Sequence, residues 1–245
     1  MKSLLITILL FMMIIPKDNF KTNQLQNSRV KEAYQAKEKE VLETLKKHNI
    51  ETKTLEIFIR VLKKEQIIEL WARNRNEKFV FLKNFQICSS SGVLGPKRMI
   101  GDDQTPEGFY YINRFNPYSN FYLSLGISYP NNSDRILSNA KDLGGDIYIH
   151  GNCVTIGCIP ITDDKIKELY IYATEAKNSG QENIPVHIFP TRLDDTSFKT
   201  LSKQYASDKS LIAFWENLKT GFNYFEKNHE LPRVSILKNG LYDFQ

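Results

Sequence analysis

Residues 147–164 read IYIHGNCVTIGCIPITDD and place a histidine and a cysteine in one short stretch. A β-type run ends at His150, Gly151 follows it directly, and Cys158 comes eight positions after the histidine. A cysteine is mostly a neutral thiol at neutral pH, so a catalytic cysteine needs a neighbour that accepts its proton. Histidine suits that role because its ordinary pKa lies near neutrality. The stretch therefore predicts a thiol nucleophile at Cys158 with His150 as its base.

Two glycines fit the same interpretation. Gly151 allows a sharp backbone turn, so that a main-chain carbonyl can hold the imidazole of His150. Gly157 removes a side chain where a substrate carbonyl must approach and lets backbone N–H groups point at a developing oxyanion. A zinc site built from His150, Cys153 and Cys158 is the alternative, but it lacks a clear fourth ligand and the usual paired spacing.

The motif His150-Gly151 followed by Thr155-x-Gly157-Cys158 resembles the signature of L,D-transpeptidases of the YkuD type. Its short spacing and its continuation into residues 162–166 resemble the YafK-like branch of that family. The resemblance runs from about residue 55 to about residue 190. Further motifs that resemble that branch are Gly95-Pro96-Lys97, Gly101-Asp102, the run TPEGFY at 105–110 and the run SYPN at 128–131.

The resemblance implies a role for each matching residue. Cys158 would be the acyl-accepting nucleophile, His150 its base and Gly151 the source of the carbonyl that orients the imidazole. The oxyanion hole would be built by the turn that contains Thr155, Ile156 and Gly157. The substrates would be peptidoglycan stem peptides, with no cofactor and no metal.

The chain departs from the family pattern at two positions. Ile156 stands where many relatives have a histidine, which leaves His150 as the base that the motif offers. Pro160 stands where many relatives have an arginine, so the typical cross-linking arrangement of acyl donor and acceptor is not assured.

Several polar residues outside the motif are candidates for substrate contact. A basic side chain beside the cleft would suit the carboxylates of a stem peptide, although solvated surface is the bland alternative. The candidates are Lys97, Arg98 and Tyr129, with Tyr111 and Arg135 on the same footing. Asp163 and Asp164 are interpreted as the acidic first turn of a helix that has Thr162 as its N-cap.

Composition excludes some functions and outlines the organisation. The 245 residues are 41% hydrophobic and 25% charged with a net charge of +5, which is typical of a globular protein. The lysines are scattered, so no nucleic-acid partner is predicted. Residues 1–16 match a signal peptide or an uncleaved N-terminal membrane anchor. The expected divisions are a helical segment at 17–53, the catalytic domain at 54–190 and a helical extension with a terminal hairpin at 191–245.

Repeated short β signals between residues 55 and 190 predict the fold class. The core is expected to be mostly β, an antiparallel β-sandwich or barrel-like structure, with flanking α-helices at both ends. The resemblance implies a β-rich, sandwich-like fold as well. The aromatic faces of the C-terminal helices are expected to pack on this core, with a partner or glycan platform as the alternative.

The three cysteines are interpreted in the light of export. An odd number leaves at least one thiol free in an oxidising compartment, and the nucleophile Cys158 should be that one. Cys88 and Cys153 can then pair with each other. Cys153 can equally be a small buried residue or an oxidation partner of Cys158, and the sequence leaves these alternatives open.

The sequence therefore predicts an exported cysteine peptidoglycan L,D-transpeptidase of the periplasm or cell envelope. A cysteine hydrolase of stem peptides, or of proteins linked to them, would use the same Cys158 and His150. A non-catalytic cell-wall binding protein is the third hypothesis, which the intact His150, Gly157 and Cys158 disfavour.

Overall fold

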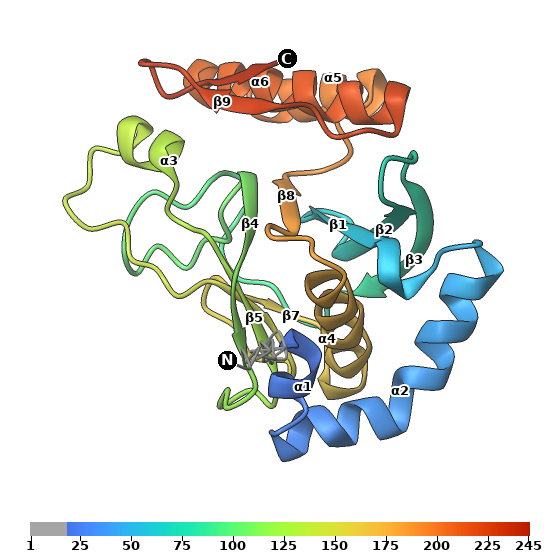
Figure 1. Cartoon of the computed structure of the whole chain (residues 1–245). Helices are drawn as coiled ribbons and strands as arrows, with labels where there is room; N and C mark the ends of the chain where they lie inside the picture. The colour runs from blue at the N-terminus through green and yellow to red at the C-terminus, as the bar shows by residue number, and fades with distance from the viewer. Residues whose placement is uncertain (1–18) are drawn as a thin grey trace, which may run out of the picture.

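The structure is a computed structural model that describes residues 19–245 (Figure 1). The signal or anchor predicted for residues 1–16 lies outside the described residues. No helix within residues 19–245 is long and apolar enough to cross a membrane. In chain order the described elements are α1 (Phe20–Gln24), α2 (Ser28–Lys47), η1 (Thr52–Thr54), β1 (Leu55–Leu62), β2 (Ile67–Asn74), β3 (Val80–Gln86), β4 (Gly108–Asn116), β5 (Ser124–Ile127), α3 (Asn132–Leu137), β6 (Tyr148–His150), β7 (Ile159–Pro160), α4 (Asp163–Asn178), β8 (Pro185–Phe189), α5 (Asp195–Gln204), α6 (Lys209–Asn228), β9 (Val234–Ile236) and β10 (Tyr242–Phe244).

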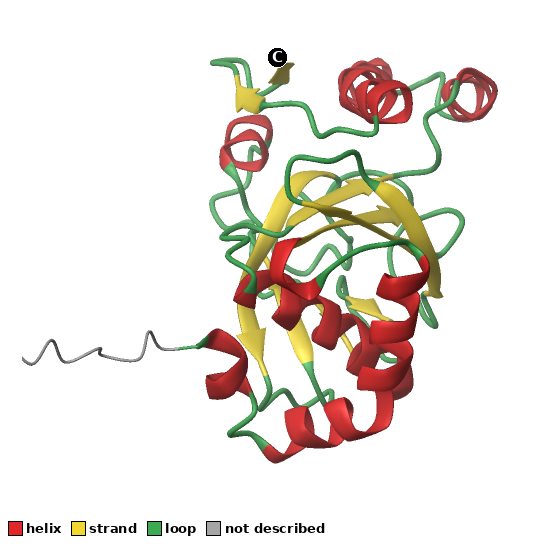
Figure 2. Cartoon of the chain, turned by 45° about the vertical axis from the view of Figure 1, so that its right-hand side comes forward, coloured by secondary structure: helices red, strands yellow, loops and turns green. Residues whose placement is uncertain are grey.

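The centre of the molecule is one curled, mixed sheet. Its strands run in the order β3-β2-β1-β8-β4-β5-β6-β7, and they curve around the helices beneath them (Figure 2). Most neighbours are antiparallel, but β1 pairs with β8 and β6 pairs with β7 in parallel. The sandwich and the purely antiparallel pairing that the sequence predicted are therefore wrong, whereas the barrel-like, β-rich core with helices at both ends is confirmed.

The parallel pairs have a physical cause in the connections between strands. A parallel neighbour needs a crossover, because a tight turn can only reverse the chain. Helix α4 provides the crossover that brings the chain back through β8 beside β1. Between β6 and β7 the crossover is the loop 151–158, which follows His150 and contains Gly157 and Cys158.

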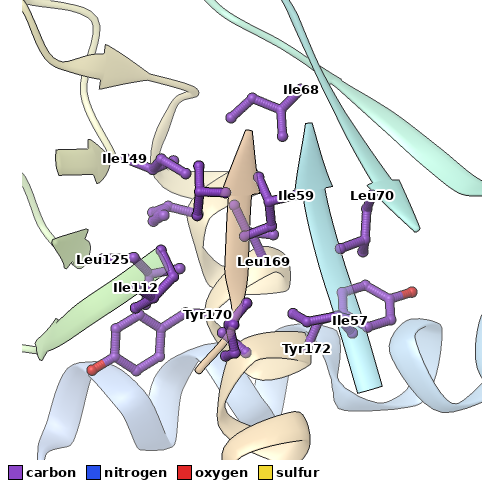
Figure 3. Close-up of a cluster of buried hydrophobic side chains, with 14 of the residues drawn as sticks. Ile57, Ile59, Ile68, Leu70, Ile112, Leu125, Ile149, Leu169, Tyr170 and Tyr172 are labelled. Atoms are coloured by element: carbon purple, nitrogen blue, oxygen red, sulfur yellow. The ribbon is translucent and has the colours of Figure 1, made fainter. Parts of the chain in front are cut away.

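Strand β1 shows why both faces of the sheet are covered. Successive side chains of a strand point to opposite faces. Ile57 and Ile59 join the core shared with α4, where Leu169 packs near them (Figure 3). Leu62 joins a second core on the other face, and Phe58 lies in a third cluster. A strand that is apolar on both sides requires such burial on both sides.

The C-terminal extension supplies the second cover. Helices α5 and α6 and the β9–β10 hairpin lie together beyond the sheet (Figure 1). Trp215 and Leu218 of α6 pack with Leu62 and Phe189 of the sheet. The packing predicted for the C-terminal helices is confirmed, as is the hairpin, in which the N–H of Leu237 donates to the Leu241 carbonyl.

A buried carboxylate connects this extension to the sheet. Glu107 is fully buried just before β4 and accepts hydrogen bonds from two side chains and one main-chain N–H. The donors are Lys63 Nζ at 2.9 Å, Trp215 Nε1 at 2.6 Å and the Gly95 N–H at 2.8 Å. A buried charge that loses its partners is strongly destabilising. The hydrogen bonds to Glu107 therefore hold α6 against the sheet.

Some local expectations need correction. The sequence carries two separate β signals, at 79–82 and 85–88, but these residues form one strand, β3, which continues through polar Lys83 and Asn84 because it pairs with β2. Helix α3 and the short strand β7 were not predicted. The helical pattern of the sequence runs from Ser28 to about His48, and α2 agrees with it to within one residue.

Candidate active site

His150 ends strand β6, and its imidazole is held from two sides. Nδ1 lies 2.5 Å from the Gly151 carbonyl oxygen. Since a carbonyl can only accept, Nδ1 carries the proton and Nε2 keeps its lone pair. The ring stacks on Phe121 with centroids 4.5 Å apart. Burial lowers the pKa of His150, which the Gly151 hydrogen bond partly offsets, so the ring is a neutral base at neutral pH.

The free nitrogen of this ring is the important one. Nε2 of His150 is buried and has no hydrogen-bond partner among residues 19–245. Buried polar atoms in folded proteins are usually paired, so an unpaired one suggests a role in chemistry or ligand binding. His150 and Cys158 line one cleft of about 270 Å³, together with Phe121, Val154, Thr155 and Ile156. The predicted nucleophile and base thus share a cleft.

Cys158 is half-buried at the edge of that cleft. Its Sγ donates to the main-chain carbonyl of Asp146 at 3.6 Å. Burial raises the pKa of the Cys158 thiol, a hydrogen bond from the Tyr148 backbone lowers it, the Asp146 charge raises it and the Lys97 charge lowers it. The net rise means that the resting residue is a neutral thiol, and a proton must leave before it can attack.

The turn before Cys158 is organised by Thr155. Its hydroxyl donates to the Cys158 carbonyl at 2.8 Å and accepts from the Gly157 N–H at 3.2 Å. Gly157 has a φ of +120°, and a Cβ there would lie 2.9 Å from the Gln104 carbonyl oxygen. Glycine is therefore required at this position. The Gly157 N–H, which was predicted to face an oxyanion, is already used by Thr155 in this arrangement.

Gly151 is required for a second reason besides orienting the imidazole. A Cβ on Gly151 would lie 2.8 Å from the Phe121 carbonyl oxygen and would also collide with the Asp163 carboxylate. Asp163 Oδ1 accepts from the Asn152 N–H at 2.7 Å and so fixes the loop that follows His150. Thr162 takes the N-cap position of α4, but its side chain makes no capping hydrogen bond.

The other two cysteines form a disulfide. Cys88, just after β3, is bonded to Cys153 in the middle of the loop between His150 and Cys158. The Cys88 N–H also donates to the Pro160 carbonyl at 3.0 Å. The pairing that the sequence left open is thus resolved, and Cys158 is the free thiol. A zinc site with Cys153 as ligand is excluded by the bond, and no metal-binding cluster occurs within the described chain.

The three predicted substrate contacts do not line this cleft. Lys97 is 4% exposed and donates to the Asp102 carboxylate at 2.6 Å and to the Met99 carbonyl at 2.8 Å. Arg98 pairs with the buried Asp134 at 3.0 Å. Tyr129 is buried and donates to the Leu143 carbonyl at 3.1 Å. Each side chain is accounted for by an internal partner, although the charge of Lys97 reaches Cys158.

The two remaining candidates lie elsewhere. Arg135 on α3 donates to the Pro130 carbonyl at 3.0 Å, and Tyr111 of β4 is exposed beside a different groove. Sequence reasoning missed Phe121, which stacks on the imidazole of His150, and Asp146, whose carbonyl accepts a hydrogen bond from the Cys158 thiol. No local pattern identifies either residue, because both reach the motif only through the pairing of β5 with β6 and the approach of the 145–147 segment to Cys158.

A curled, β-rich domain whose cleft is lined by both a histidine and a free cysteine is the arrangement of a cysteine-dependent enzyme. A family model for the L,D-transpeptidase catalytic domain, YkuD, matches residues 56–188. The chain belongs to this L,D-transpeptidase family, as the resemblance indicated.

A curated relative agrees with the assignment. The chain is 37% identical over 188 residues to the Escherichia coli K12 protein named "Putative L,D-transpeptidase YafK", an alignment that covers 76% of this chain and 72% of that protein. Among solved structures, the helical cell shape determining protein Pgp2 of Campylobacter jejuni is similar at 18% identity with a TM-score of 0.44, over 75% of this chain and 73% of that one. Bd1075 of Bdellovibrio bacteriovorus is similar at 19% identity with a TM-score of 0.41, over 75% of this chain and 77% of that one.

Proposed function

We propose that this protein is an exported L,D-transpeptidase that forms a thioester on Cys158 from a carbonyl of a peptidoglycan stem peptide. One observation carries the proposal. His150 has its Nδ1 side fixed by the Gly151 carbonyl and its Nε2 unpaired, in the same cleft as the free thiol of Cys158. Membership of the L,D-transpeptidase family supplies the substrate class.

The chemistry follows from the protonation states. The thiol exchanges its hydrogen bond to the Asp146 carbonyl for one to His150 Nε2, which takes the proton as the sulfur attacks the substrate carbonyl. The carbon–nitrogen bond then breaks, and the imidazolium returns its proton to the leaving amine. An amine of a second stem attacks the resulting thioester, giving the new amide and restoring the thiol.

The cleft suits an acyl chain more than an ionic group. Val154 and Ile156 are exposed apolar residues of its wall, and Ile156 is 79% exposed. An acyl chain bound against these two side chains would cover them and remove apolar surface from water. Ile156 was predicted to belong to the turn that builds the oxyanion hole, and its side chain lines the wall of the cleft.

Mass spectrometry of peptidoglycan fragments incubated with the protein tests this function. We expect new cross-linked dimers with the wild-type chain and none with Cys158→Ala. A His48→Ala protein, altered at a histidine at the end of α2, is the matched control and should form dimers as the wild type does. Absence of any Cys158-dependent product from sound substrate and folded protein would refute the proposal.

A cysteine hydrolase is the second candidate, and one observation favours it. Pro160 occupies the position of the arginine found in many relatives, and it is buried in β7 with its carbonyl bonded to the Cys88 N–H. Without that guanidinium, the chain at this position offers no cation to hold an acceptor stem. Shortened stems or released linked peptides without dimers, in the same experiment, would select hydrolysis.

Export is supported by two features of the chain. Residues 1–16 have the basic start and apolar run of a secretory signal, and the Cys88–Cys153 disulfide is of the kind that persists in oxidising compartments. We expect the full chain to be recovered from the cell envelope or periplasm with this disulfide formed. A chain without residues 2–16 should stay in the cytoplasm with all thiols reduced. Equal distribution of the two proteins would contradict export.

A further inference from the structure

A second large groove lies away from the cysteine cleft, beneath the C-terminal hairpin. Its volume is about 750 Å³, within the range of about 300–1,000 Å³ common for ligand sites. One wall comes from β4 and β8, with Tyr111 and His187, and the other from the hairpin region, with Val234 and Ile236. The groove shares no lining residue with the cleft of Cys158.

The groove is lined without charged side chains. A quarter of all residues are Asp, Glu, Lys or Arg, yet none of these types lines the groove. Its single titratable base, His187, is neutral as well, because burial and the nearby Arg60 lower its pKa to about 3. A charged ligand would lose its hydration here without gaining an ion pair, so the groove selects a neutral ligand.

The groove nevertheless offers many hydrogen bonds. Asn132 and Asn183 are exposed, so their amide groups are open to a ligand, and Ser128 adds a hydroxyl. Tyr111 is 45% exposed and presents a ring face together with its hydroxyl. Amide side chains beside an exposed aromatic ring fit a sugar, which has hydroxyls at its edge and C–H groups on its face.

His187 brings an imidazole to the lining of the groove. It is 5% exposed, and the rings of Phe58 and Phe109 pack edge-on against it with centroids 4.6 and 4.5 Å away. Neither ring offers a hydrogen-bond partner to a nitrogen of the imidazole. A hydroxyl or amide of a ligand placed in the groove could supply one.

The walls of the groove are fixed before any ligand arrives. Tyr242 of β10 accepts a hydrogen bond from the Asn131 amide at 2.9 Å, and its backbone exchanges two hydrogen bonds with Asn217 of α6, both at 2.8 Å. Ser133 of α3 donates to the Gly240 carbonyl at 2.6 Å. The hairpin is thus joined to α3 and α6, and a preformed site loses less entropy on binding.

We propose that this groove binds the neutral glycan strand of peptidoglycan, a polymer of N-acetylated amino sugars. The acetamido methyl groups would pack on Val234 and Ile236, and their amides would pair with Asn132 or Asn183. Bound there, the strand would be held at a distance from Cys158 while a stem peptide reaches the cleft. That choice of saccharide rests on the proposed function.

Titration of the folded Cys158→Ala chain with a tetramer of β-1,4-linked N-acetylglucosamine tests the groove. We expect saturable binding that Tyr111→Ala weakens about tenfold or more and Asn183→Ala weakens less. Tyr118→Ala is the matched control, since Tyr118 is 80% exposed and lies outside the groove, and it should bind as the parent does. A glucose tetramer without acetamido groups should bind more weakly.

Three results would overturn the proposal. They are no saturable binding of the tetramer, binding that Tyr111→Ala and Asn183→Ala both leave unchanged, and equal weakening by Tyr118→Ala. The outcome is separate from that of the proposed function, because a Cys158→Ala chain performs no thioester chemistry. If the wild-type protein yields no Cys158-dependent product but still binds the tetramer, the proposed function is refuted and the saccharide-binding proposal stands.

Discussion

Two buried histidines of this protein differ in what surrounds them, and the difference shows how an imidazole becomes a base. Burial lowers the pKa of both His150 and His187. His150 is oriented by the Gly151 carbonyl and shares a cleft with the free thiol of Cys158. His187 is enclosed by phenylalanine rings on the floor of another groove. Burial makes each ring neutral, but orientation and an adjacent acid make only His150 a candidate base.

The largest effect is expected from replacing His150, the histidine that the Gly151 carbonyl orients. His150→Ala should lower turnover by about 10²–10⁴-fold, the usual contribution of a general base, while circular dichroism still reports the native fold. Steady-state assays on soluble stem peptides measure the change, beside the His48→Ala control. Near-normal turnover in His150→Ala would remove this residue as the base and end the contrast with His187.

The next effect concerns the loop that gives His150 its orientation. Replacing both Cys88 and Cys153 by serine opens a link between residues 65 positions apart. The loop-closure entropy of such a link corresponds to about 4 kcal/mol of unfolding free energy. Urea denaturation of the double variant should show the loss, together with lower turnover. The Cys158→Ala chain keeps the disulfide and is the control; an unchanged midpoint in the double variant would contradict a stabilising role.

The enclosed histidine, His187, should affect how the free energy of unfolding changes at acid pH. The pKa of His187 is about 3 in the folded chain and near 6.5 when exposed, so the unfolded chain takes up the proton first as the pH falls. Its stabilising contribution is complete above about pH 6.5 and is lost progressively toward pH 3, by a few kcal/mol at most. Unfolding curves between pH 7 and pH 4 should therefore be flatter for His187→Phe. Parallel curves would show that another group controls this range.

The smallest effect concerns the thiol beside His150. Because the pKa of Cys158 is raised, iodoacetamide should label the resting chain several-fold more slowly at pH 7 than it labels a free cysteine. The rate should keep rising into the alkaline range, and mass spectrometry locates the label. A rate that is already constant below pH 8 would instead indicate a resting thiolate–imidazolium pair, and His150 would then be charged, unlike His187.

Much of the sheet could be predicted because its strands carry local signals. The β-type runs at 55–60, 66–71 and 184–190 predict β1, β2 and β8, and the helical period of the apolar residues predicts α2 and α4. The parallel pairing of β1 with β8 could not be predicted, since it depends on where α4 returns the chain. Strand β7 was missed because its two residues are a strand only beside β6.

The site shows the same limit. His150, Gly151, Gly157 and Cys158 were identified from one contiguous stretch, where spacing carries the chemical information. Phe121 was not, because it meets the imidazole only after β5 and β6 have paired. The disulfide of Cys88 was left open for a similar reason, as the nearness of its partner is a property of the folded chain.

The buried Glu107 has a consequence for where the protein can be cut. The family match ends at residue 188, and a fragment trimmed there would lose Trp215 from the Glu107 carboxylate and leave Lys63 as its remaining side-chain partner. It would also uncover the apolar face that contains Leu62 and Phe109, a surface prone to aggregation. We therefore expect the smallest fragment that can be produced in soluble form to extend well past the segment that the family model matches, to the last hairpin of the chain.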